Sequence, residues 1–276
     1  MKKTNTKDII FYSCLCVAIA IFVAAVAYFT PRDYGITSSL YKRGTTFGVV
    51  FEILGPVFMP FFTIYSVVGV TCLCGIKNKT KKILCYIGVW IFYVYAFFMG
   101  TFTLKYSYAP YLFVPSIIAY VGFTGFSFFI SEKCKKNGKA ETHLKVCLVM
   151  LFTCLVSLVL VDIIKLVFGR IRYFELGDGE YYFWYRLNSP KLNSSFPSGH
   201  VSRAATALCF GLLFEYSAKK NTALIIFTEV FAVAFTVAVA VSRLYEGMHY
   251  PVDIITGGFL TALGYYISKK FMIWGE

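Results

Sequence analysis

Long apolar stretches recur along the whole chain, and no other feature constrains its fold so strongly. A bilayer core requires about 20 apolar residues of α-helix, and only helices or closed barrels satisfy their backbone hydrogen bonds there. The stretches are continuous rather than alternating, which favours helices over barrel strands. We therefore predict an all-α, polytopic membrane bundle of about eight helices, at approximately 9–29, 47–76, 83–104, 111–130, 146–168, 200–217, 222–241 and 252–268.

The composition agrees with a membrane protein. Hydrophobic residues make up 58% of the 276-residue chain and charged residues 15%, whereas soluble domains carry about 25% charged residues. The first stretch is longer than the roughly 7–15 apolar residues of a signal peptide, so we expect an uncleaved span. The second contains Pro56 and Pro60, which predict a kink because proline cannot donate a helical hydrogen bond.

Basic residues gather in the connections on one side of the predicted spans. The net charge is +13, and lysines cluster within residues 2–7, 77–82, 133–145, 219–220 and 269–270. This positive-inside pattern predicts that both termini lie in the cytoplasm, and it would also attract anionic lipids. Because no basic domain lies outside the membrane, we expect no nucleic-acid partner.

Three polar stretches interrupt the apolar pattern, and charged residues in a membrane are costly enough to indicate function. By the count of spans, all three lie at the same membrane face, where we expect them to converge. The first closes the fifth span with Asp162, Lys165 and residues 169–173, the second opens the sixth with residues 195–200, and the third joins the last two spans with residues 242–253.

The cationic residues at this face suit a phosphate group. Lys165, Arg172 and Arg243 offer fixed positive donors to an anion. Pro197 and Gly199, at a helix start, would expose backbone N–H groups at the positive end of the helix dipole. We therefore predict a phosphate-binding site.

The histidines add proton transfer and nucleophilic chemistry. His200 and His249 can exchange protons near neutral pH. Asp253, four residues after His249, is close enough to accept from one ring nitrogen and leave the other free as a nucleophile. No cage of Asp and His for a divalent ion is evident, and the cysteines form neither a metal cluster nor a disulfide framework. We expect catalysis without a metal or a cofactor.

The three stretches together resemble the type 2 phosphatidic acid phosphatase superfamily, which includes bacterial diphospholipid phosphatases, glucose-6-phosphatases and vanadium haloperoxidases. Lys165 and Arg172 keep the spacing of the family's first motif, Pro197 to His200 match the second, and Ser242, Arg243, His249 and Asp253 match the third. We call the stretches 165–172, 195–200 and 242–253 motifs one, two and three. Tyr173 replaces a proline that is usual in the family, and Glu246 replaces an apolar residue.

The resemblance implies a role for each matched residue. His249 would attack phosphorus, Asp253 would hold its ring, and His200 would protonate the leaving oxygen and then activate water. The phosphoryl oxygens would be held by Lys165, Arg172, Arg243, Ser198 and the Gly199 backbone. The family core of six helices would occupy residues 83–276, with two additional helices in residues 1–82.

We therefore expect a metal-independent membrane phosphatase that hydrolyses a lipid phosphomonoester or diphosphate through a phosphohistidine. Phosphatidic acid-like lipids, phosphatidylglycerol phosphate and polyprenyl diphosphate remain open as substrates. The expected location is a bacterial cytoplasmic membrane, with the site on the extracytoplasmic face. The alternatives are a transporter, a non-catalytic lipid-binding protein, a phosphatase of soluble sugar phosphates and a vanadate-dependent haloperoxidase. A transporter would carry charges deep in several spans, whereas these gather at one face.

Other polar residues receive weaker assignments. Asp162 is expected to support Lys165 at helical spacing, and Glu52 is a candidate neighbour of the site. Glu246 would either pair with Arg243 or select against particular head groups. Arg203, one turn after His200, would either support the site or contact phosphate, and His143 is expected to be structural.

Overall fold

The chain is all-helical in the residues described by its computed structural model, which are 6–105, 110–176, 181–187, 195–216 and 220–274. No strand occurs within these ranges, so the predicted fold class is confirmed. The α-helices are α1 (Thr6–Phe29), α2 (Asp33–Leu40), α3 (Thr46–Leu54), α4 (Phe58–Leu73), α5 (Lys79–Lys105), α6 (Phe113–Lys136), α7 (Ala140–Leu155), α8 (Val161–Phe168), α9 (Gly199–Ala205), α10 (Phe210–Glu215), α11 (Thr222–Tyr245) and α12 (Pro251–Lys269).

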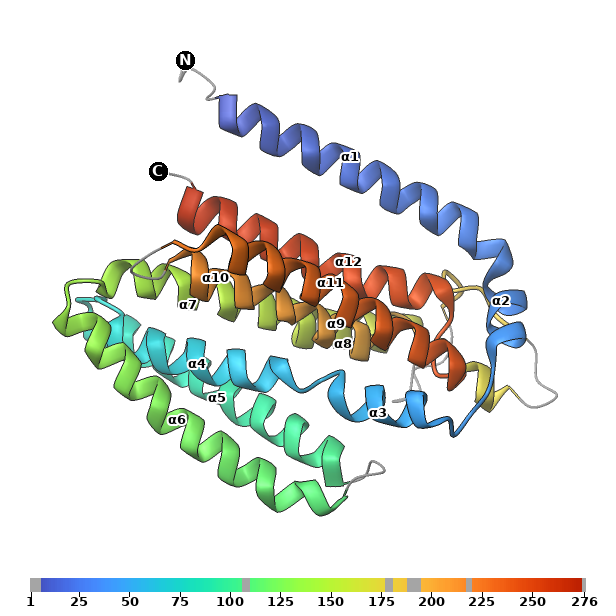
Figure 1. Cartoon of the computed structure of the whole chain (residues 1–276), viewed down its shortest axis with the longest axis horizontal. Coiled ribbons are helices and arrows are strands. Elements are labelled where there is room, and N and C mark those ends of the chain that lie inside the picture. The colour runs from blue at the N-terminus through green and yellow to red at the C-terminus, as the bar shows by residue number, and fades with distance from the viewer. Residues whose placement is uncertain (1–5, 106–109, 177–180, 188–194, 217–219, 275–276) are drawn as a thin grey trace.

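The long helices run side by side along the long axis of the molecule, as Figure 1 shows. Helix α1 lies along one edge next to α12, and α5 and α6 form the opposite edge. Between them, α4 packs against α6 and α7, and α9 packs against α11 and α12. The core between these helices contains the fully buried side chains of Val67, Met150, Cys154, Leu158 and Leu212.

Six helical segments within the described ranges are long and apolar enough to cross a membrane. They are Asp8–Leu40, Thr46–Leu73, Lys79–Phe98, Phe113–Lys136, Ala140–Glu175 and Thr222–Tyr245. These segments correspond to the first five predicted spans and the seventh, and they indicate an integral membrane protein. The predicted spans at 200–217 and 252–268 also fold as helices but are not among the six, so the count of eight is not confirmed.

The second span is interrupted where its sequence predicts a kink. Helix α3 ends at Leu54 and α4 begins at Phe58, on either side of Gly55 and Pro56. Proline has no N–H group with which to continue the hydrogen-bond ladder, so the span is divided into two helices there. In contrast, α7 continues into α8 through a π-helical turn at Val156–Leu160.

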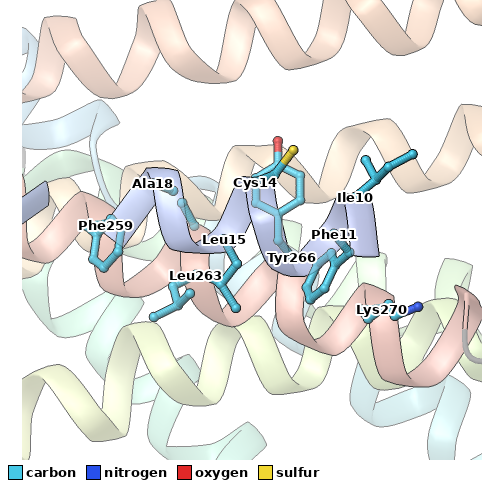
Figure 2. Close-up of a pocket in the computed structure, with 10 residues that line it drawn as sticks. Ile10, Phe11, Cys14, Leu15, Ala18, Phe259, Leu263, Tyr266 and Lys270 are labelled. Carbon is cyan, nitrogen blue, oxygen red and sulfur yellow. The ribbon is translucent and has the colours of Figure 1, made fainter. Parts of the chain in front are cut away.

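The outer faces of the edge helices are apolar. The side chains of Ile21 on α1, Ile91 on α5 and Ile118 on α6 are each more than 60% exposed. Contiguous exposed apolar surface is unfavourable in water and favourable in lipid. Between α1 and α12 lies an apolar groove of about 730 Å³, lined by Leu15, Ala18, Phe259, Leu263 and their neighbours (Figure 2).

The two ends of the bundle differ in character. Both chain termini lie at one end in Figure 1, together with the turn between α6 and α7. There Lys270 pairs with Asp8 and so joins the last helical turns to the start of α1. At the opposite end lie α2, the start of α3 and the start of α12. We call these the terminal end and the site end.

Candidate active site

Motif one turns back into the bundle at the end of α8. Gly169 ends the helix with a φ of 54°, a left-handed conformation that glycine adopts without steric cost. Beyond this turn the Arg170 side chain is fully buried, whereas Arg172 is half-buried. Lys165, in the last turn of α8, lies beside motif two, because a Cβ atom added to Gly199 would be 3.6 Å from Lys165 Nζ.

Motif two is fastened to the start of α12. Ser198 caps α9, and its Oγ accepts from the Val201 N–H at 3.4 Å. The Ser198 N–H donates to the Asp253 carbonyl at 2.9 Å. A Cβ atom added to Gly257 would lie only 2.3 Å from the Ser198 carbonyl oxygen. Glycine at position 257 therefore lets the two backbones approach closely.

The His249 ring is oriented by a backbone carbonyl. Its Nδ1 lies 2.7 Å from the Ser195 carbonyl oxygen, and the nearest Asp253 carboxylate oxygen is 3.8 Å away. A carbonyl can only accept a hydrogen bond, so Nδ1 carries the proton and Nε2 keeps its lone pair. Asp253 is therefore close to the ring, as its spacing predicts, but it is not the direct acceptor.

The charge state of His249 suits a nucleophile. Burial lowers the pKa of His249 to about 4, and the neighbouring Asp253 acts in the opposite direction. The ring is therefore neutral at physiological pH, and its Nε2 is available to an electrophile.

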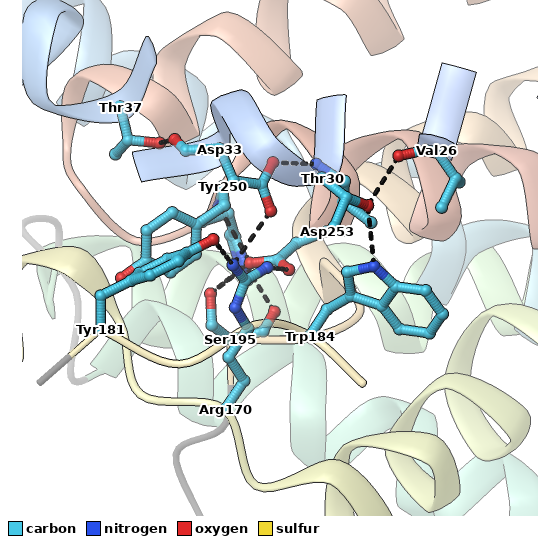
Figure 3. A network of polar contacts seen from close by, with 12 residues as sticks. Val26, Thr30, Asp33, Thr37, Arg170, Tyr181, Trp184, Ser195, Tyr250 and Asp253 are labelled. Carbon is cyan, nitrogen blue, oxygen red and sulfur yellow. Dashed lines mark hydrogen bonds and ion pairs between the residues drawn. The ribbon is translucent and has the colours of Figure 1, made fainter. Parts of the chain in front are cut away.

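Asp253 belongs to a buried network that Figure 3 shows. One oxygen accepts from Ser195 Oγ at 2.5 Å and from the Tyr250 N–H at 2.9 Å. The other accepts from Arg170 Nη1 at 2.6 Å. The second terminal nitrogen of Arg170 donates to Asp33 Oδ2 and to the Tyr181 hydroxyl, both at 2.9 Å. Arg170 and both carboxylates are fully buried.

Arg243 is held by the start of the second span. Its Nη1 donates to Glu52 Oε2 at 3.1 Å, and its Nη2 donates to the Gly48 carbonyl at 2.6 Å. Its Nε donates to Ser242 Oγ at 3.2 Å. Glu52, proposed from the sequence as a neighbour of the site, is thus an ion-pair partner of a motif residue.

Glu246 has a different partner from the one considered above. Both of its oxygens accept from the Gly44 N–H at 3.1 Å, and its side chain is fully buried against Gly48. Nearby, the Lys42 N–H donates to the Tyr245 carbonyl at 2.8 Å. Glu246 therefore fastens the segment before α3 to motif three.

Several buried nitrogen atoms at the site end lack a hydrogen-bond partner among the described residues. They are Arg170 Nε, Arg172 Nε, His200 Nε2 and Arg203 Nε. Arg243, Arg203, His249 and Lys165 lie near enough to His200 for their charges to act on its ring, so the motif residues form one cluster. A buried donor without a partner is costly, and an anion with several oxygen atoms would satisfy such donors.

Asp162 and His143 were also assigned roles from the sequence, and the structure shows the contacts of both. The Asp162 carboxylate lies 3.7 Å from Arg203 and accepts from the Tyr95 hydroxyl at 3.1 Å. Asp162 is thus an ion-pair partner of Arg203. His143 lies on α7 near the terminal end, where its Nε2 is 3.5 Å from Ser131 Oγ.

The sequence alone assigned no role to Asp33, Arg170 or Ser195, although Arg170 and Ser195 lie within motifs one and two. Asp33 follows an apolar helix and belongs to none of the three motifs. Arg170 stands two residues before Arg172, and Ser195 stands two residues before Pro197. The available indication was that Asp33 and Arg170 are charged residues at predicted span ends, where charge is costly unless it is paired.

The fold defines an all-helical integral membrane protein, and its motif histidines and cationic side chains gather at one end of the bundle. Residues 142–274 match the sequence model of the PAP2 superfamily, and the resemblance drawn from the motifs is confirmed. All three motifs lie within the matched residues. No curated protein and no solved structure matches the chain. The match to the PAP2 superfamily indicates phosphatase activity on phosphoesters.

Proposed function

We propose that this protein is a metal-independent phosphatase that hydrolyses a membrane-lipid phosphomonoester or diphosphate through a phosphohistidine on His249. The hydrogen bond from His249 Nδ1 to the Ser195 carbonyl carries this proposal, because it leaves Nε2 as the nitrogen with a free lone pair. The unpartnered nitrogens of Arg172 and His200 support a phosphoryl group as the bound electrophile.

The reaction proceeds in two displacements. The lone pair of His249 Nε2 forms a bond to phosphorus, and the bond from phosphorus to the ester oxygen breaks with its electron pair on that oxygen. His200 gives a proton to the departing oxygen. His200 then takes a proton from water, whose oxygen attacks phosphorus, and the phosphorus–nitrogen bond breaks to release inorganic phosphate.

The phosphoryl oxygens gain negative charge during both displacements. Lys165, Arg172 and Arg243 neutralise this charge, and Ser198 with the Gly199 N–H adds hydrogen bonds at the positive end of α9. Arg243 and Ser198 are held by backbone contacts before substrate binds, so these two groups require little reorganisation.

A lipid substrate fits the position of the site. The cluster lies at the end of helices that are apolar enough to cross a membrane, where lipid head groups are found. In the membrane orientation given by the positive-inside rule, this end is extracytoplasmic. We propose a lipid of the outer leaflet, and polyprenyl diphosphate is one such substrate.

A phosphate-release assay in detergent tests the substrate class. The set contains phosphatidic acid, phosphatidylglycerol phosphate, a polyprenyl diphosphate and glucose 6-phosphate. Faster turnover of the lipids supports the proposal, whereas preference for the sugar phosphate would contradict the lipid assignment. Halide oxidation in the presence of vanadate, without phosphate release, would instead favour a haloperoxidase.

Replacement of the nucleophile tests the mechanism. His249→Ala should reduce phosphate release to below about 1% of wild type, because a covalent nucleophile contributes far more than 100-fold to the rate. Acid quench of the wild type with ³²P-labelled phosphatidic acid should trap an acid-labile phosphoenzyme that the variant lacks. His143→Ala is the matched control, because this buried histidine lies near the terminal end, and it should retain activity and phosphoenzyme. Residual activity well above that level in His249→Ala would move the nucleophile elsewhere.

A further inference from the structure

Asp33 contacts the catalytic network from outside the segment that matches the family. It begins α2, whereas the match starts at residue 142. Its Oδ2 accepts from Arg170 Nη2 at 2.9 Å, and its Oδ1 accepts from the Val252 N–H at 3.0 Å. Its side chain is fully buried. Asp33 is therefore bound both to Arg170 and to the first turn of α12.

Asp33 changes the net charge of the group of carboxylates and arginine beside His249. Arg170 contacts two carboxylates, Asp253 on one terminal nitrogen and Asp33 on the other. With both carboxylates ionised, one positive and two negative charges leave the group with one net negative charge. Without Asp33, Arg170 would neutralise Asp253, and a neutral pair would face His249. Charges in a buried site are weakly screened, so this difference in net charge changes the electrostatic potential at the His249 ring.

The reaction places a positive charge on that ring. When His249 Nε2 bonds to phosphorus, Nδ1 keeps its proton on the Ser195 carbonyl, and the ring becomes cationic. The charge disappears when water displaces the ring from phosphorus. A net negative group 3.8 Å from Nδ1 therefore stabilises the first transition state and the intermediate relative to the free enzyme.

We propose that Asp33 is a positioning residue that keeps the Asp33–Arg170–Asp253 group negative and so stabilises the phosphohistidine. This inference rests on the proposed function of His249. Asp33 acts through Arg170 and Asp253, and it does not contact the substrate. The region before the matched segment thereby takes part in the chemistry of the motifs.

Tyr181 provides a matched control for a purely structural role. Its hydroxyl accepts from the same Arg170 nitrogen as Asp33, at the same distance of 2.9 Å. Tyr181→Phe removes a hydrogen bond from that nitrogen without changing the charge. Asp33→Asn removes the charge and keeps an oxygen that can accept from the Val252 N–H. A role of Asp33 limited to holding the guanidinium in place predicts similar losses in the two variants.

The experiment compares both variants with wild type in full-length, detergent-solubilised protein. Rapid acid quench with ³²P-labelled phosphatidic acid measures formation and breakdown of the phosphoenzyme separately. We expect Asp33→Asn to slow formation about 10–100-fold and leave breakdown as fast or faster, so that less phosphoenzyme accumulates. The KM should change little. Tyr181→Phe should change each rate by less than about threefold, in line with loss of one neutral hydrogen bond.

A second variant tests the net charge itself, because it loses both Asp33 and Arg170 and so keeps the charge of wild type. Replacement of Arg170 by Gln together with Asp33→Asn leaves Asp253 as the only charge and restores one net negative charge. This double variant should form phosphoenzyme faster than Asp33→Asn alone. A slower rate, or equal slowing of formation and breakdown in Asp33→Asn, would overturn the inference. Failure of wild type to form any phosphoenzyme would overturn the proposed function as well.

Discussion

Arg170 and Arg243 are fully buried, and each is paired with a carboxylate from the N-terminal part of the chain. An unpaired buried charge would cost several kcal/mol, so Asp33 and Glu52 stabilise these arginines before substrate binds. Arg172 differs, because its Nη1 donates to the weakly accepting sulfur of Met248 at 3.6 Å, and its Nε has no partner among the described residues. Arg172 is therefore the arginine best prepared to bind an incoming anion.

The side chains around the site predict phosphatase activity that does not require a metal ion. Cationic side chains neutralise the phosphoryl group, and the nearest carboxylates are already bound, with Asp33 and Asp253 on Arg170 and Glu52 on Arg243. Activity should therefore survive excess EDTA. Orthovanadate should inhibit competitively as a mimic of the transition state. Phosphate release in dialysed protein, with and without Mg²⁺, provides the measurement, and strict dependence on Mg²⁺ would contradict the proposal.

Short helices and breaks between helices form the site. Helix α8 ends at Gly169, α9 begins at its Ser198 cap, and His200 lies beside the break between α3 and α4, within reach of a Cβ atom added to Gly55. Close packing of α9 against α12 sets the spacing between motifs two and three. The division of the chain at residue 82 stays a prediction, although residues before it contact two motif arginines.

Two neighbouring glycines of α12 test this packing. In Gly257→Ala the new Cβ would lie 2.3 Å from the Ser198 carbonyl oxygen, so the backbone of motif two must move. We expect a loss of stability of about 1–3 kcal/mol and a reduction of kcat of about 10-fold or more from displaced groups. In the control Gly258→Ala, the nearest atom is 3.5 Å away, and the change should be neutral or slightly stabilising. Thermal unfolding in detergent and kcat are measured for both variants. Equal effects of the two substitutions would contradict this account of the packing between α12 and motif two.

In the whole molecule, the two ends of the bundle carry different sets of charged side chains. The terminal end contains the ion pairs of Lys270 with Asp8 and of Lys269 with Glu215. The site end contains the motif cluster and the network around Arg170. Lysines of the connections on the predicted cytoplasmic side, such as Lys135 and Lys139, belong to the terminal end. We therefore propose that the site end faces the extracytoplasmic side.

Cysteine labelling tests this orientation. Ser39 on α2 and Asn137 after α6 are both exposed. Each is replaced by Cys in a background in which Cys14, Cys16, Cys72, Cys74, Cys85 and Cys134 are serine, and the fully buried Cys147, Cys154 and Cys209 are kept. A membrane-impermeant maleimide applied to intact cells should label position 39 and not 137. Labelling after permeabilisation is the control, and the reverse pattern would place catalysis in the cytoplasm.

Local signals in the sequence were sufficient for the helices and for most of the cluster. Continuous apolar stretches predict helices because only a helix satisfies its own backbone in lipid, and Pro56 predicts the break after α3. Spacing within each motif was also informative, since Lys165 and Arg172 or His249 and Asp253 are joined by a few residues of chain. The predicted spans 200–217 and 252–268 are not among the six segments long and apolar enough to cross a membrane, and the first of them is divided into the short helices α9 and α10.

By itself, the sequence determined the all-helical membrane fold, the resemblance to the PAP2 superfamily and the motif residues that we propose to hold and attack phosphate, because these depend on hydropathy and on short spacings along the chain. Only the tertiary structure decided which groups the motif residues contact. Ser195, rather than Asp253, accepts from His249, Glu52 rather than Glu246 pairs with Arg243, and Asp33 joins Arg170. These partners are separated by tens to hundreds of residues, and their pairing follows from how the helices pack, which no local pattern records.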